Sequence, residues 1–248
     1  MESLFRYTAA PSRCGYLPDQ QWSLEYEYVA ELSPEEYLQR MLDGWRRFGH
    51  MLFRPACERC TACKALRVRV GEFRPDRSQR RCRQRNEGVV ELQVGPPSVS
   101  VVKLALYDRY HAFQAEAKGW PEHPPKDAES YFESFVHHPF GVEEWCYYLD
   151  GRLVGVGYVD CMPSAPAGGE GEGREGLSAI YFYHDPGERD RGLGTWNVLC
   201  LIEEARRRGL PYLYLGYYVA GCRSMEYKTR FVPNEVRGDD GVWGLFRP

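Results

Sequence analysis

The spacing of hydrophobic residues predicts helices and strands along the whole chain. In "LSPEEYLQRMLDGWRRFGHMLF", apolar residues recur at helical spacing after Ser33, which forms a capping-box pattern with Glu36, so a helix is expected from Pro34. The segment "ALRVRV", residues 65–70, alternates with a period of two and predicts a strand. The paired prolines of "VGPPSV" near residue 96 interrupt both patterns, and we place a domain boundary there.

Beyond residue 96 the predicted elements follow a definite order. Helices are expected at 103–119 and 127–138, then a hairpin turning at Asp150-Gly151, strand 177–184, a glycine turn, helix 194–208 and strand 211–219. The segment "MPSAPAGGEGEGREG" between the hairpin and the third strand predicts a loop. This order resembles the acyl-CoA N-acyltransferase (GNAT) fold. We therefore expect an α/β (α+β) protein, with a GNAT-like domain at 96–248 and a smaller cysteine- and arginine-rich domain at 1–95.

Composition narrows the class of protein. The chain has 248 residues, of which 43% are hydrophobic, which is enough for one large or two small packed domains. It contains no apolar run of 18 residues and begins with no apolar leader, so we expect a cytoplasmic protein without a membrane partner. The nine cysteines, an odd number, favour reduced thiols or metal ligands over a disulfide framework.

Positive charge is concentrated in one segment, although the chain carries a net charge of -3. Residues 64–85 contain nine lysines and arginines against two acidic residues. Such a density suits the backbone of a polyanion, and a solvated helix face is the alternative interpretation. The arginines of "FRPDRSQRRCRQRN" are Arg74, Arg77, Arg80, Arg81, Arg83 and Arg85.

A second candidate for phosphate binding is the glycine turn in "RDRGLGTWN". Free backbone N–H groups between a strand and a helix can hold phosphate, whereas a tight connection that only avoids steric conflict is the alternative. The candidate residues are Arg191, Gly192, Leu193, Gly194 and Thr195.

Several long segments resemble the aminoacyl-tRNA-protein transferases, in particular the bacterial aspartate/glutamate leucyltransferase branch. They are "CGYLP" at 14–18, "GWRRFGHMLFRPACERCTACKALRVRV" at 44–70, "FRPDRSQRRCRQRN" at 73–86, "YFYHDP" with "GLGTW", and "YLYLGYYVAGCRSMEYKTRFVPNE" at 212–235. The resemblance implies transfer of leucine, or arginine, from aminoacyl-tRNA to the N-terminal Asp or Glu of acceptor proteins, which marks them for proteolysis. It also implies that the glycine turn and the arginines hold tRNA phosphates.

Two departures from that family keep other functions open. Gly192 stands where the family has serine, which is nearer to the coenzyme A pattern, and Ser224 stands where the family has lysine. A coenzyme A dependent N-acetyltransferase is therefore one alternative. The other is a non-catalytic module that binds tRNA or senses a metal cluster.

The reaction implied by the resemblance needs no cofactor, because the ester of aminoacyl-tRNA is already activated and an α-amine titrates near pH 8. A general base or an oxyanion donor would help, and strand residues beside the turn are candidates unless they only fill the core. They are Tyr181, Tyr183, Asp185, Tyr217 and Tyr218. An acidic acceptor requires a cationic pocket. The candidates for that pocket are Arg223, Tyr227, Lys228 and Arg230.

Three cysteines with regular spacing form the remaining motif. Cys57, Cys60 and Cys63 can face one ion from a tight loop, and Cys14 can complete the set if the N-terminus folds back. We expect an iron–sulfur cluster or zinc there, with a metal-free group of buried cysteines as the alternative. Cys82, Cys146, Cys161 and Cys200 are interpreted as isolated small hydrophobic residues.

Overall fold

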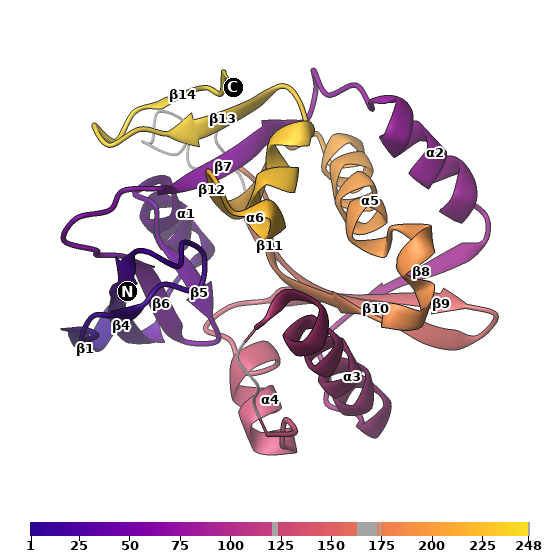
Figure 1. The fold of residues 1–248 in the computed structure, drawn as a ribbon, viewed down its shortest axis with the longest axis horizontal. Helices are drawn as coiled ribbons and strands as arrows, with labels where there is room; N and C mark the ends of the chain where they lie inside the picture. The colour runs from indigo at the N-terminus through magenta and orange to yellow at the C-terminus, as the bar shows by residue number, and fades with distance from the viewer. Residues whose placement is uncertain (121–123, 163–172, 174, 248) are drawn as a thin grey trace.

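The computed structural model describes residues 1–120, 124–162, 173 and 175–247. Its centre is a mixed sheet with the strand order β14-β13-β7-β12-β11-β10-β9-β8 (Figure 1). The strands are β7 (Cys63–Arg69), β8 (Val90–Gly95), β9 (Val142–Leu149), β10 (Arg152–Met162), β11 (Gly176–His184), β12 (Tyr212–Val219), β13 (Asn234–Arg237) and β14 (Trp243–Leu245). The expected mixed α/β class is confirmed. The domain division near residue 96 stays a prediction. The large sheet contains strands from both sides of that residue, because β7 and β8 precede it and the other strands follow it.

The two central strands of this sheet separate along their length. β11 and β12 form its parallel pair, and their pairing covers only residues 176–178 of β11 and 212–214 of β12. Beyond this point β12 continues beside β7, while β11 continues beside β10. Tyr181 pairs with Tyr158 and Ala179 with Val159, which leaves Ile180 as a bulge in β11. We call the opening beyond Ser178 and Tyr214 the splay.

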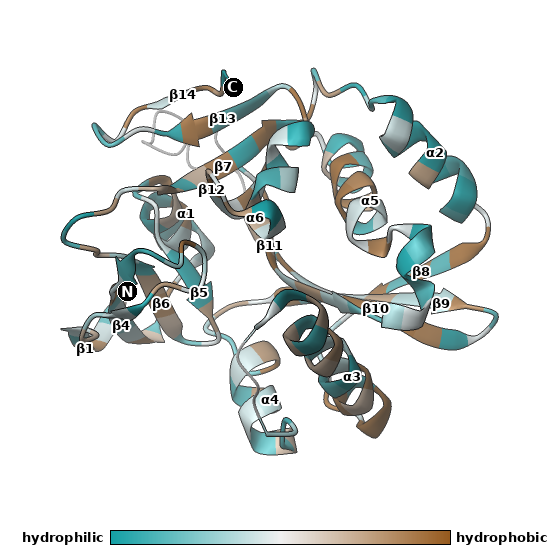
Figure 2. Cartoon of the chain, in the orientation of Figure 1, coloured by the Kyte–Doolittle hydropathy of each residue, from teal (hydrophilic) through white to brown (hydrophobic). Residues whose placement is uncertain are grey.

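Helices cover both faces of the sheet. α3 (Val101–Lys118) and α4 (Ala128–Phe135) lie below it in Figure 1, where Leu106 and Phe135 pack with Tyr158. α5 (Leu193–Arg207) packs on the opposite face through its apolar side, and the largely hydrophilic α2 (Arg77–Asn86) lies outside α5 (Figure 2). None of the described helices is both long and apolar enough to cross a membrane.

A smaller sheet stands at the left of Figure 1, with the strand order β1-β4-β6-β5. Its elements are β1 (Glu2–Thr8), β4 (Leu24–Glu31), β5 (Arg46–Phe48), β6 (Met51–Pro55) and the covering α1 (Pro34–Leu42). The fully buried ion pair between Arg47 of β5 and Asp160 of β10 joins this sheet to the large one. The short elements are β2 (Ser12–Arg13), β3 (Gln21–Trp22), the 3-10 helices η1 (Pro186–Arg191) and η2 (Tyr227–Arg230), and α6 (Arg223–Glu226).

Local signals account for many of the boundaries. Ser33 and Glu36 form the predicted capping box, but the helix ends at Leu42, and the rest of the segment predicted as helical forms the strands β5 and β6. Asp127 caps α4, which ends at Phe135 and is therefore shorter than predicted. The hairpin between β9 and β10 turns at Asp150 and Gly151, whose φ angles are 49° and 74°. The predicted loop at 162–176 lies mostly outside the described residues.

Candidate functional site

The glycine turn connects β11 to α5 through η1. Gly192 is the N-cap of α5 with a φ of 67°, and no side chain caps the helix there. The first N–H groups of a helix have no intrahelical partner, so this end attracts anions. A Cβ on Gly194 would meet no atom within 4 Å, which leaves space directly beside these donors.

α2 packs against this turn. The thiol of Cys82 donates to the carbonyl oxygens of Arg191 and Gly192 at 3.5 Å, and Asn86 Nδ2 donates to Arg191 O at 2.9 Å. Arg191 Nη1 in turn donates to Arg85 O at 3.5 Å. An open depression between the two elements is lined by Arg85, Gly187, Glu188, Asp190 and Arg191. The structure thus brings the two predicted phosphate-binding segments together, and Cys82 serves as a packing contact between them.

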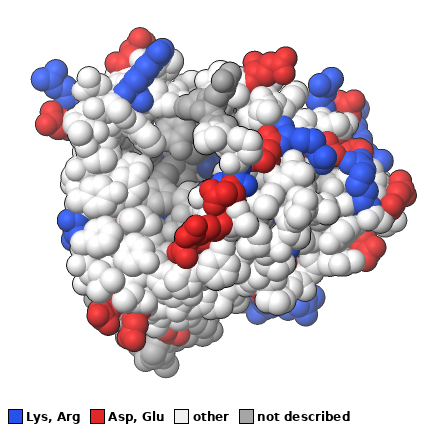
Figure 3. Space-filling view, turned by 90° about the horizontal axis from the view of Figure 1, so that it is seen from below, with Lys and Arg blue, Asp and Glu red and all other residues white. Residues whose placement is uncertain are grey.

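The predicted arginines form an exposed and largely unpaired group. In the described part of the chain only Arg83 among the six pairs with a carboxylate, that of Glu203 at 3.1 Å. Arg74 and Arg80 donate to nearby backbone carbonyls. Seen from below, lysines and arginines gather with some acidic residues on the right side of the molecule (Figure 3). The surface over the small sheet is mostly uncharged, and it is hollowed beside that sheet.

Tyr181 has a partner that sequence reasoning missed. Its hydroxyl lies 2.7 Å from Nε2 of His111 in α3, and Nδ1 of the same ring lies 2.9 Å from Tyr107 O. Because a carbonyl oxygen only accepts, Nδ1 carries hydrogen, and Nε2 of the neutral ring accepts from Tyr181. Burial raises the pKa of Tyr181 well above its ordinary range. The phenol therefore keeps its proton and donates to His111.

Tyr183 on the same strand and Asp185, which follows the strand and caps η1, have other partners. The hydroxyl of the buried Tyr183 contacts that of Tyr131, which also contacts Tyr158. Asp185 accepts from Gly187 N at 2.9 Å and pairs with Arg152. Burial alone would raise the pKa of Asp185, but these two contacts, together with the charge of Arg109, outweigh it and the pKa is lowered.

The candidates on β12 point to opposite sides. Tyr217 is buried, and its hydroxyl donates to Gly44 O at 2.7 Å. Tyr218 packs edge-on against Phe246, with ring centroids 5.1 Å apart. Neither hydroxyl has a titratable partner in these contacts, so of the five predicted residues Tyr181 has the environment best suited to proton transfer.

The four predicted acceptor-binding residues lie on α6 and η2 but do not form one pocket. Arg230 pairs with Asp76 at 3.1 Å, whereas Arg223 and Tyr227 are exposed. Lys228 is buried, and its Nζ donates to Tyr217 O at 2.7 Å. Burial, followed by the nearby charge of Arg46, lowers the pKa of Lys228 to about 7.

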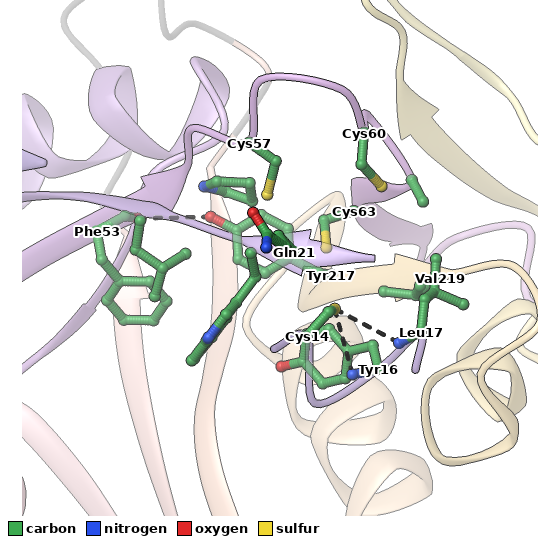
Figure 4. Close-up of a pocket in the computed structure, with 14 residues that line it drawn as sticks. Cys14, Tyr16, Leu17, Gln21, Phe53, Cys57, Cys60, Cys63, Tyr217 and Val219 are labelled. Atoms are coloured by element: carbon green, nitrogen blue, oxygen red, sulfur yellow. Dashed lines mark hydrogen bonds between the residues drawn. The ribbon is translucent and has the colours of Figure 1, made fainter. Parts of the chain in front are cut away.

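The four cysteines predicted as ligands line one pocket of about 50 Å³. Cys57 and Cys60 follow β6, and their sulfur atoms point toward Cys63 and Cys14 (Figure 4). The sulfur of Cys14 accepts from Tyr16 N and Leu17 N at 3.4 Å, as the dashed lines show. The N-terminal segment thus folds back onto the loop, which is the condition under which Cys14 can join the other three cysteines.

A fifth thiol, Cys222, belongs to the same neighbourhood and has no spacing signal in the sequence. Burial, and then the neighbouring Cys57, Cys14, Cys60 and Cys222, raise the pKa of Cys63 to about 12. Thiolate donors suit zinc and iron–sulfur clusters. As the described side chains stand, however, no three of Cys, His, Asp or Glu are arranged so that they could hold one metal ion.

Comparison with known proteins shows which family the chain resembles. Family models match the chain at both ends: Arginine-tRNA-protein transferase, N terminus, over residues 12–81, and Arginine-tRNA-protein transferase, C terminus, over 102–238. A protein of Marinobacter nauticus named aspartate/glutamate leucyltransferase is 37% identical, with 98% of this chain and 96% of its own length covered. One of the same name from Helicobacter hepaticus is 34% identical, with 90% and 88% covered. The solved structure of L-PGS from Bacillus licheniformis has 14% identity and a TM-score of 0.44, covering 72% of this chain and 48% of its own.

Proposed function

Because the chain belongs to the arginine-tRNA-protein transferase family and is an aminoacyl-tRNA-protein transferase, we propose that it transfers leucine to acceptor proteins that begin with Asp or Glu. The choice of leucine and of acidic acceptors follows the name shared by the relatives. We further propose that it works in the cytoplasm, where aminoacyl-tRNA is available, and that the added residue marks acceptors for proteolysis.

The contact between α2 and the glycine turn carries this proposal. Asn86 and Cys82 hold the backbone at Arg191 and Gly192, so exposed arginines stand beside the free N–H groups of α5. Five of the six arginines have no carboxylate partner among the described residues. A coenzyme A molecule would use the turn alone, whereas the acceptor stem of a tRNA presents phosphates to both elements.

A GNAT-like fold for the catalytic domain is the second part of the proposal. It is supported by the bulge at Ile180, by the short parallel pairing of β11 with β12, and by the turn that leads into α5. The splay gives the activated carbonyl a place between the two strands, where backbone N–H groups could stabilise a developing oxyanion. Residues 96–248 would supply this unit, with β7 completing the sheet beside β12.

The proposed reaction is direct aminolysis of the ester. The acceptor's α-amine attacks the carbonyl carbon, a C–N bond forms, the C–O bond to the ribose breaks, and an amine proton ends on the ribose oxygen. Tyr181 and His111 relay that proton in our account, because their 2.7 Å contact joins a phenol to an imidazole. No cofactor takes part in these steps.

The test is transfer to a peptide that begins with Asp or Glu, using leucyl-tRNA and arginyl-tRNA charged separately. We expect leucine to be incorporated and arginine to be incorporated far more slowly. Preferential transfer of arginine would change the proposed donor, and acetylation of the peptide by acetyl-coenzyme A without any transfer from tRNA would replace the proposal as a whole.

We propose that Cys14, Cys57, Cys60 and Cys63 hold an iron–sulfur cluster or zinc. This proposal is supported by the position of the four sulfur atoms around one pocket. In the arrangement of the described residues no three of these side chains could hold one metal ion, so the sulfur atoms would have to move closer together when the metal or cluster binds. Such a group would supply a structural crosslink between the N-terminal segment and β7.

Elemental analysis of protein purified without oxygen tests this site. We expect iron with sulfide, or zinc, in wild type and its loss in Cys60→Ser, whereas Cys161→Ser on β10 keeps the metal. Active wild-type protein that contains neither iron nor zinc would rule the group out.

A further inference from the structure

Two cations are buried at the splay. Arg46 of β5 and Lys228 of η2 keep only 7% and 9% of their surface exposed. Arg46 is far from Lys228 in the sequence, and nothing in its local pattern indicates a binding role. The fold brings both side chains to the place where β11 and β12 separate.

Each cation binds one of the separated strands. Arg46 Nη2 donates to Ala179 O of β11 at 2.8 Å, and Lys228 Nζ donates to Tyr217 O of β12 at 2.7 Å. Arg46 also lies against β12, because a Cβ on Gly216 would stand 3.7 Å from its Nε and Nη2. The guanidinium therefore lies between the two strands.

These cations differ from every other buried lysine and arginine in the described residues. The others each have a carboxylate: Arg47 pairs with Asp160, Arg67 with Glu235, and Lys103 with Glu144. Neither Arg46 nor Lys228 makes an ion pair in the part of the chain that the structure describes, and the carboxylate of Asp160, which is paired with Arg47, acts on Arg46 only at longer range. An unpaired buried charge is costly, and two of them side by side also repel each other.

We propose that Arg46 and Lys228 hold the side-chain carboxylate of the acceptor's first residue. An arginine has five N–H donors and a lysine three, so donors remain after each has bound its backbone carbonyl. A carboxylate has two oxygens and can accept from both side chains at once. The proposal rests on the proposed specificity for acidic acceptors and names the residues that would produce it.

The position of the pair also fits the reaction. Arg46 binds Ala179, two residues before Tyr181 on β11, so an acceptor held there has its α-amine close to the proposed proton relay. The tRNA phosphates have a separate surface at α2 and the glycine turn. The acceptor is the other substrate, and the anion that it brings into the splay is the carboxylate of its first side chain.

The experiment compares two peptides that are identical except for Asp or Asn at the first position. Wild type should prefer Asp. Arg46→Gln and Lys228→Gln should each lower kcat/KM for the Asp peptide by about 10- to 100-fold, the usual weight of a hydrogen bond to a charged group, and leave the Asn peptide nearly unaffected. Arg46→Lys, which keeps the charge, should restore part of the preference.

Lys103→Gln is the matched control, since Lys103 is a buried lysine that has a carboxylate partner. It should lower the melting temperature without changing the preference for Asp over Asn. A wild-type preference that both glutamine variants retain would overturn the pocket and leave the proposed function intact. A wild type that treats Asp and Asn alike would overturn both, and a raised KM for aminoacyl-tRNA with an unchanged preference would assign the pair to a tRNA phosphate.

Discussion

Gly194 is the residue whose substitution separates phosphate binding from folding. Nothing lies within 4 Å of a Cβ added there, so Gly194→Val should change the free energy of unfolding by less than about 1 kcal/mol. If a phosphate approaches the start of α5, the added side chain obstructs it, and transfer should fall at least about tenfold. Gly192→Val is the contrasting variant, because Gly192 has a φ of 67° and a Cβ there would meet Cys82 Sγ at 3.5 Å.

The test is to measure the rate of amino-acid transfer and the urea midpoint of unfolding for both variants. We expect Gly194→Val to lose transfer and Gly192→Val to lose stability as well. If Gly194→Val lost stability but kept its transfer rate, the turn would be a connector between strand and helix only.

Other single residues show where sequence reasoning stops. Tyr181 could be selected because it stands on a strand before a glycine turn. His111 and Arg46 could not, because their roles come from contacts with β11 made by distant parts of the chain. A lone polar residue in an apolar helix or strand carries no spacing signal that separates these roles from ordinary packing.

α2 is the element whose charge should set the salt dependence of tRNA binding. Arg80→Ala with Arg81→Ala should weaken binding and flatten the slope of log affinity against log salt by roughly 1 for each phosphate that the variant no longer binds. Arg207→Ala on α5 is the control, since that exposed arginine pairs with Glu204 at the far end of the helix. An unchanged slope in the α2 variant would remove this helix from the tRNA surface.

Caps and periodicity predicted most helices and the β9–β10 hairpin, since these depend on neighbours in sequence. Strand order could not be predicted in the same way. β7 pairs with β12 and β13, and β8 pairs with β9, across long stretches of chain. The alternation of "ALRVRV" indicates a strand without indicating its partner. The sequence therefore predicted a boundary near residue 96 but could not predict that one sheet continues across it.

The buried Arg47–Asp160 pair is one of the contacts that connect the two sheets. Removing one partner leaves a buried charge without compensation, so Arg47→Met should lower the free energy of unfolding by about 3–5 kcal/mol. Adding Asp160→Leu should recover much of the loss. Arg207→Met, which breaks an exposed pair with Glu204, should have little effect in the same urea titration. Equal stabilities of Arg47→Met and wild type would show that the pair does not join the sheets.

The function of the whole molecule depends on which phosphate-bearing molecule the turn and α2 hold together. The direct measurement is competition against leucyl-tRNA in the transfer assay, with coenzyme A in one series and an RNA acceptor-stem mimic in the other. We predict that the stem mimic inhibits transfer in wild type and loses most of this effect in Gly194→Val and in the Arg80/Arg81 variant, while coenzyme A has no effect. Strong inhibition by coenzyme A, with no response to the stem mimic, would contradict the account.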